Sequence, residues 1–188
     1  MLDRSEQQTL LRLARRTLEV VVGRGGRVRE VELSDLDLTP SLRENRGAFV
    51  TLTTRATDDL RGCIGYIEGR EPLYLAVMDN ARNAALSDPR FPHVRPKEVP
   101  ALHLEISALG PLEPCPDPSK IEIGVHGLVV ECGERRGLLL PQVPVEWGWD
   151  RETFLRQTCK KAGVAENAWR SPDAQLYWFA AQVFGEER

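Results

Sequence analysis

The sequence predicts an α+β protein with a mainly antiparallel sheet flanked by helices. Short runs rich in β-branched and aromatic residues alternate with segments of helical periodicity. Most connections between the predicted strands are too short for a parallel crossover. No G-x-G-x-x-G or G-x-x-x-x-G-K-[ST] phosphate loop occurs, which disfavours a doubly wound fold. With 188 residues, 41% of them hydrophobic, the chain can fill one core or two small lobes.

The first predicted element is an amphipathic helix from Ser5 to about Val22. Ser5 and Gln8 have the spacing of a capping box, and Gly23 is a plausible C-cap. The apolar side of this helix repeats at helical spacing through Leu10, Leu11, Ala14, Leu18, Val21 and Val22. After it, Thr39-Pro40 predicts a short helical turn.

A β-hairpin is predicted next. Residues 48–54 are rich in β-branched and aromatic types, and 57–59 form a turn. The chain returns through 60–66, so Cys63 is expected in or beside the second strand.

A second helix follows, then a proline-punctuated loop and a strand. Pro72 suits the first position of a helix running to about Ser87, whose small residues allow close packing on a sheet. Residues 87–92 form the loop. Residues 102–109 alternate between apolar and polar types, which predicts one buried face and one polar face carrying His103, Glu105 and Ser107.

The C-terminal part of the chain has a connector, strands and a third helix. Residues 110–119 hold four prolines, and this connector is the candidate seam between two lobes of a single domain spanning 1–188. Strands are expected over 121–132 and 138–141, and Asp150 is expected to cap the third helix, which Gly163 closes. The last apolar segment, 175–184, is expected to be a buried strand.

Composition excludes several functional classes. The net charge of −3 and pI near 5.7 give no global positive field to hold a polyanion. The sequence has no run of about 18 apolar residues, so it predicts no membrane helix. Its polar N-terminus lacks the apolar core of a secretory signal. The four cysteines form no C-x-x-C pair, and no two histidines have i, i+4 spacing. We therefore expect a cytoplasmic protein without a metal or another cofactor.

The segment Leu60-Arg61-Gly62-Cys63-Ile64-Gly65 carries the clearest chemical signal. Gly62 and Gly65 bracket a thiol and would let a ligand approach the backbone closely. Arg61 would favour the thiolate of Cys63 if both faced one cleft. A nucleophilic thiol or an anion-binding loop fits these residues. A strand bulge with a buried, inert Cys63 and Arg61 in a surface ion pair fits them too.

Other residues are candidates to complete such a site. His126, between Val125 and Gly127, is the best candidate base for Cys63. Arg90 could add a second guanidinium at an anion site, or serve only its own loop. Phe91 and Glu146 are the remaining ligand-binding candidates, although Phe91 could equally fill the core.

A short arginine–glycine segment raises a third possibility. Residues 23–29 contain Arg24, Arg27 and Arg29 and faintly resemble an RNA-binding segment. The run is short and has acidic neighbours, so a solvated loop is the favoured interpretation.

Several motifs in order resemble the AMMECR1 domain family, which includes the A protein of the AmmeMemoRadiSam system. Leu60 to Gly65 (LRGCIG) resembles the family's signature hexapeptide. Further resemblance runs from about Arg46 to Phe184, through 85–92, 102–109, 124–128, 138–143, 149–150 and 161–163. Pro144 departs from this pattern, because an alanine is expected there, and this weakens any role for Glu146.

The resemblance implies a fold of two unequal lobes, with the hexapeptide near a groove between them. It also implies association with Memo-like and radical S-adenosylmethionine proteins in a modification pathway. We therefore expect a groove around residues 60–65 that binds a small ligand or a partner. The alternatives are a cysteine-dependent enzyme acting on an anionic substrate and, more weakly, an RNA-binding module.

Overall fold

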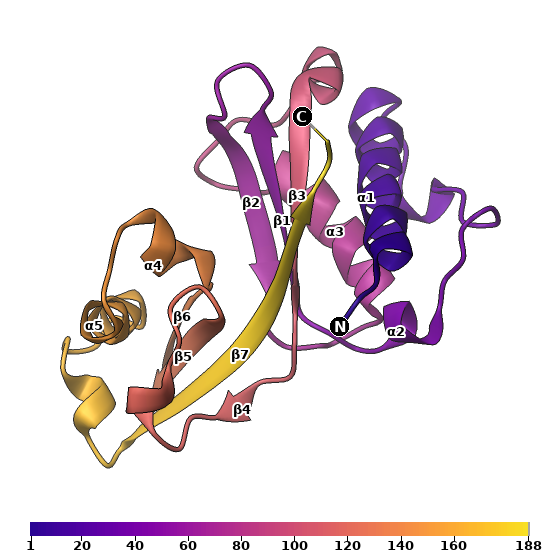
Figure 1. Cartoon of the computed structure of the whole chain (residues 1–188). Coiled ribbons are helices and arrows are strands. Elements are labelled where there is room, and N and C mark those ends of the chain that lie inside the picture. The colour runs from indigo at the N-terminus through magenta and orange to yellow at the C-terminus, as the bar shows by residue number, and fades with distance from the viewer. Residues whose placement is uncertain (188) are drawn as a thin grey trace. The chain divides into compact units, whose positions relative to one another are not determined.

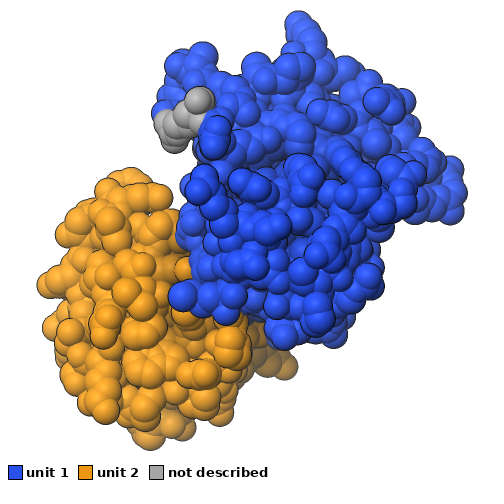
Figure 2. Space-filling view, turned by 45° about the vertical axis from the view of Figure 1, so that its right-hand side comes forward, with its two compact units in different colours: residues 1–109, 182–188 blue, residues 110–181 orange. Residues whose placement is uncertain are grey.

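The computed structural model describes residues 1–187, which form two compact units. The first unit comprises Met1–Leu109 and the end of the chain from Gln182, and the second comprises Gly110–Ala181 (Figure 2). The division after Leu109 falls where the proline-rich connector begins. Helices and an antiparallel sheet confirm the predicted α+β class (Figure 1).

The first unit is built on three antiparallel strands in the order β2-β1-β3. These are β1 (Ala48–Thr54), β2 (Leu60–Tyr66) and β3 (Leu102–Leu109), with the limits that the sequence predicts. The C-terminal end of β7 (Ala174–Gly185) lies beside β3. The turn between β1 and β2 includes Asp58 at a φ of 57°. Because β2 is at the edge of the sheet, one side of its backbone faces no strand among the described residues.

Helices α1 (Arg4–Leu18) and α3 (Leu73–Leu86) pack on one face of this sheet. The predicted cap of α1 at Ser5 is wrong. Asp3 caps the helix, and its carboxylate and that of Glu6 form a reciprocal capping box. A π-helical turn, Glu19–Gly23, continues α1, and the predicted turn after Thr39 is the short α2 (Pro40–Arg43). Short 3₁₀ helices occupy Val28–Glu30 and Pro96–Ala101.

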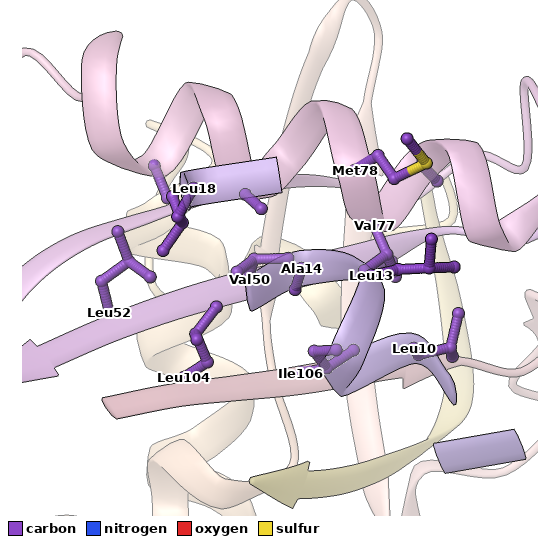
Figure 3. Close-up of a cluster of buried hydrophobic side chains, with 14 of the residues drawn as sticks. Leu10, Leu13, Ala14, Leu18, Val50, Leu52, Val77, Met78, Leu104 and Ile106 are labelled. Carbon is purple, nitrogen blue, oxygen red and sulfur yellow. The ribbon is translucent and has the colours of Figure 1, made fainter. Parts of the chain in front are cut away.

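The core of the first unit lies between these helices and the sheet (Figure 3). Leu10 and Leu13 of α1 and Val77 of α3 are fully buried against the strands. Val50 of β1 and Ile106 of β3 meet them from the sheet. Burial stabilises each such aliphatic side chain by roughly 1.5–3 kcal/mol. This packing fixes β1 and α3, and both of these elements contact β2.

The second unit is a smaller α+β body. Its strands β4 (Glu113–Pro114), β5 (His126–Cys132) and β6 (Arg135–Leu139) and the first part of β7 all pair antiparallel. Asp150 caps α5 (Arg151–Lys161) as predicted, through its carboxylate and the Thr153 amide. The short α4 (Gln142–Glu146) was not predicted, and 3₁₀ turns occupy Pro118–Lys120 and Ala168–Arg170.

Two predictions of burial are wrong. The expected polar face of β3 is not exposed, because His103 and Ser107 are both buried. The chain end lies over His103, whose Nε2 is 2.8 Å from the Glu186 carbonyl oxygen. Conversely, β7 is mostly half-exposed or exposed, and Phe179 is its single buried side chain among the described residues. Sequence alternation reports residue polarity, whereas burial here depends on segments distant in sequence.

Candidate functional site

The hexapeptide forms most of the edge strand β2, and a β-bulge interrupts it at Arg61. Leu52 of β1 is opposite Gly62, and the next residue of β1, Thr53, is opposite Leu60. Arg61 is therefore the extra residue of the bulge. Bulges change the direction of a side chain relative to the regular strand. The bulge that the sequence allowed as an alternative is confirmed.

The Arg61 guanidinium is largely buried and joins β2 to the segment before β3. Its Nε donates to Glu98 over 2.9 Å, and its two terminal nitrogens donate to the carbonyl oxygens of Pro92 and His93 over 2.8 and 3.3 Å. Its hydrogen bonds lower the pKa of the Glu98 carboxyl group. Arg61 thus forms an ion pair, as expected if its role is structural, and these contacts do not include the Cys63 thiol.

Gly62 and Gly65 are required by packing within the protein. A Cβ atom on Gly62 would be 2.1 Å from the Ala84 carbonyl oxygen of α3. One on Gly65 would be 2.3 Å from the Ala48 carbonyl oxygen and would also overlap the Phe49 ring. The close approaches at these glycines are therefore made by protein atoms.

Cys63 is held through its backbone by a pair of residues that we term the Asp88–Arg90 clamp. The Cys63 amide donates to Asp88 Oδ2 over 2.9 Å, and Arg90 donates to the Cys63 carbonyl oxygen over 3.3 Å. Asp88 is buried and is ion-paired to Arg90 at 2.7 Å. The hydrogen bonds from Arg90 hold the pKa of the Asp88 carboxyl group well below its usual range, against the opposing effect of burial.

Cys63 is half-buried. Because a Cβ on the preceding Gly62 would point at α3, the Cys63 side chain lies on the sheet face opposite the helices. Thr51, which is directly across from Cys63 on β1, donates its hydroxyl hydrogen to Sγ over 3.3 Å. The structural interpretation of the hexapeptide expected a buried, inert Cys63, but Cys63 is only half-buried. A half-exposed thiol with one hydrogen-bond donor can react with small reagents.

An open pocket of about 370 Å³ lies where Arg61 meets the segment before β3. We call it the Arg61 pocket. Phe91 and Pro92 form an apolar wall of this pocket, and Arg95 and Lys97 add two exposed cationic side chains. Glu98 is the single carboxylate in its lining, and Arg61 already neutralises that group. The pocket therefore combines apolar contact with a surplus of positive charge.

His126 and Glu146 belong to the second unit, whereas the other predicted site residues belong to the first. The Nδ1 atom of His126 accepts a hydrogen bond from the Glu122 amide over 3.0 Å. Its ring stacks on Trp178 with centroids 4.6 Å apart. Glu146 is exposed at the end of α4.

The structure joins the predicted site residues in two groups. Arg61 and Phe91 line one pocket, and Arg90 contacts the backbone of Cys63. Sequence reasoning did not assign Thr51, Arg95 and Lys97 to the site. The hairpin register could have indicated Thr51, because it places that residue opposite Cys63. No local signal identified the two cations.

The described residues contain neither a metal-binding cluster nor a membrane-spanning helix. Within residues 1–187, no group of three or more His, Cys, Asp or Glu side chains is arranged to hold a metal ion. No helix in that same range is both long and apolar enough to cross a membrane.

Comparisons with known proteins identify the family. The AMMECR1 family model matches residues 11–184, which include the hexapeptide and the whole Arg61 pocket. The chain belongs to the AMMECR1 family. The match also takes in about half of α1, which lies before the region of resemblance seen in the motifs.

Relatives of this AMMECR1 protein include proteins of similar length from other organisms. A protein of Thermococcus gammatolerans is 50% identical over 186 residues, covering 95% of this chain and 89% of that protein. One of Methanothermobacter thermautotrophicus is 45% identical, covering 99% and 97%. The crystal structure of the uncharacterized protein PH0010 from Pyrococcus horikoshii matches with a TM-score of 0.88 and 42% identity, covering 100% of this chain and 94% of that one.

Proposed function

We propose that this AMMECR1 protein binds a small anionic ligand, such as a phosphate or carboxylate compound with an apolar portion, in the Arg61 pocket. The observation that carries this proposal is the composition of the pocket itself. Arg95 and Lys97 stand beside the apolar Phe91 in a space of about 370 Å³, with one carboxylate that is already paired.

The two cations have different roles from Arg61. Arg61 is hydrogen-bonded to Glu98 and to two carbonyl oxygens, so its side chain has little freedom to move. It shapes the pocket and contributes positive electrostatic potential. The side chains of Arg95 and Lys97 are exposed and can turn toward a ligand. Guanidinium and ammonium groups bind phosphate and carboxylate oxygens through charge-assisted hydrogen bonds. Phe91 supplies a surface against which a flat or apolar portion of the ligand can lie.

Ligand binding in the Arg61 pocket does not require Cys63. The thiol is not in the lining of the Arg61 pocket, and its backbone is tied by the Asp88–Arg90 clamp. A cysteine-dependent reaction is the second candidate, favoured by the half-exposed thiol and its Thr51 donor. We further propose that either activity serves a cytoplasmic modification pathway with Memo-like and radical S-adenosylmethionine proteins, a proposal supported by the family resemblance alone.

Binding can be tested with inorganic phosphate and phenyl phosphate by ¹⁵N-resolved NMR titration. We expect amide shifts confined to residues 91–98 and around Arg61, with phenyl phosphate binding more tightly because of Phe91. The variant Arg95→Gln/Lys97→Gln removes two positive charges from the pocket and should weaken binding about tenfold.

A matched control is Lys120→Gln/Lys161→Gln, which removes two exposed charges from the second unit. It should leave the affinity unchanged. Equal weakening by both double variants would show that only overall charge matters. That result, or shifts centred outside residues 91–98, would contradict the proposal.

A further inference from the structure

A second and larger concave surface lies on the first unit, along the exposed side of α1. This α1 groove has a volume of about 730 Å³. One wall is formed by α1 residues between Arg4 and Arg16, and the other by the chain end, Phe184 to Glu187. None of these residues belongs to the Arg61 pocket.

The length of the α1 groove suits a short segment of polypeptide. Arg4 and Arg16 are twelve residues apart on α1. An α-helix rises about 1.5 Å per residue, so the two positions are roughly 18 Å apart along the helix axis. An extended chain rises about 3.3 Å per residue, so five or six residues span this distance.

The wall formed by the chain end is held firmly in place. Glu186 is bound by Arg15 Nε over 2.8 Å and by Arg55 over 2.8 Å. The Glu186 amide donates to the Leu104 carbonyl oxygen over 3.0 Å. A wall fixed by two arginines and by the backbone of β3 needs little ordering when a ligand binds, which favours affinity.

The lining combines apolar and cationic side chains. Leu11 and Phe184 are half-buried and pack on the core of the first unit, which leaves part of each in the groove. Four arginines line the groove against two glutamates, a formal surplus of two positive charges in a chain whose net charge is −3.

Two of these arginines are available to a partner. Arg15 and Arg16 are ion-paired to Glu186 and Asp35. Within residues 1–187, Arg4 has no ion pair, and the side chain of Arg12 has one long hydrogen bond, to the Thr9 hydroxyl at 3.4 Å. Both are exposed and lie two helical turns apart on the same wall, so they can contact two acidic side chains of one segment.

These features favour an acidic peptide over a nucleic acid. A nucleic acid carries charge along its whole backbone, so part of it would lie beside the exposed carboxylate of Glu187. A peptide can place its acidic side chains toward Arg4 and Arg12 and its apolar side chains on Leu11 and Phe184. We propose that the α1 groove binds a short segment of a partner protein in which acidic and apolar residues alternate.

Fluorescence anisotropy with a tagged hexapeptide, Glu-Leu-Glu-Phe-Glu-Leu, tests this proposal on the full chain. We expect saturable binding that weakens as salt is raised. The variant Arg4→Gln/Arg12→Gln should lose about tenfold in affinity. The same peptide with lysine in place of each glutamate should not bind.

The control variant Arg24→Gln/Arg29→Gln removes two exposed arginines outside the groove and should bind like the unaltered protein. Circular dichroism melting checks that both double variants are folded. Three results would overturn the proposal: no binding of the acidic peptide, equal loss with both double variants, or tighter binding of a ten-nucleotide uridine RNA than of the peptide. Neither the Arg61 pocket nor phosphate binding enters this experiment, so the two proposals can fail separately.

Discussion

Two glycine-bracketed segments, Gly62 to Gly65 in the first unit and Gly124 to Gly127 in the second, look alike in sequence but differ in structure. Gly62 contacts the backbone of a helix, because Ala84 of α3 occupies the space a side chain would need. Gly127 instead faces the Phe179 ring, and Gly124 has a φ of 84° in a turn. Glycine in the first segment permits contact between two backbones, whereas glycine in the second serves a turn and a side chain.

The polar partners of the two segments differ in the same way. Cys63 is linked to residues 25 and 27 positions away, through Asp88 and Arg90. His126 is linked to Glu122, four residues away, and its ring contacts Trp178 on the neighbouring strand. The hexapeptide is therefore a junction of strand, helix and loop, while the segment from Gly124 to Gly127 is a turn that leads into a strand. A disturbance at the hexapeptide should spread further.

The largest expected effect is the loss of stability in Gly62→Ala. The new methyl group meets a helix carbonyl at 2.1 Å, so β2 or α3 must move. Overpacking of this kind costs about 1–3 kcal/mol, and we expect the upper end because backbone cannot rotate away. Gly127→Ala should cost less, since its neighbour is a side chain. Gly23→Ala, with nothing within 4 Å, is the control and should be neutral or slightly stabilising.

The tryptophans allow these effects to be assigned to one unit. All four, at positions 147, 149, 169 and 178, lie in the second unit, so their fluorescence reports on that unit. In urea denaturation, Gly62→Ala should lower the midpoint seen by circular dichroism, and Gly127→Ala should lower the midpoint seen by fluorescence. A Gly62→Ala midpoint equal to that of Gly23→Ala would contradict the packing argument.

The second effect is that of Asp88→Asn, which removes the charge of the Asp88–Arg90 clamp. Asparagine can still accept one hydrogen bond, but it no longer pairs with Arg90. Loss of hydrogen bonds to a buried charged group costs about 1–3 kcal/mol. The variant Asp37→Asn, at an exposed residue outside the clamp, is the matched control and should be near neutral.

The pH dependence of stability gives the same comparison an independent test. The folded-state pKa of Asp88 lies below the unfolded value of about 3.9, so its contribution is complete above that value. It is lost as the pH falls below about 4 toward the folded-state pKa. The unaltered protein should therefore lose more unfolding free energy between pH 7 and pH 3 than Asp88→Asn does. Equal losses would mean that the clamp does not act through charge.

The sequence predicted the frame of the first unit because local signals agree there. The hairpin and the limits of β1, β2 and β3 follow from residue type and alternation. The direction of the Arg61 side chain could not be predicted, since a bulge of one residue decides it and nothing in residue type marks that residue. The Arg61 pocket depends on Glu98, which is 37 residues from Arg61. Such long-range pairing is a property of the fold and not of the motif.

The smallest expected effect concerns the half-exposed Cys63 of the first unit, compared with one half-exposed cysteine of the second unit. Cys63 has a hydroxyl donor in Thr51, and Cys132 at the end of β5 is a half-exposed reference in the second unit. Thr51→Val keeps the shape and removes the donor. A hydrogen bond is worth about 0.5–1.5 kcal/mol, so alkylation of Cys63 by iodoacetamide should slow by about two- to tenfold. Peptide mass spectrometry can follow both thiols in one sample, and the Cys132 rate should not change. An unchanged Cys63 rate would show that Thr51 does not affect the reactivity of Cys63, which would weaken the cysteine-dependent alternative and leave the Arg61 pocket as the better candidate for function.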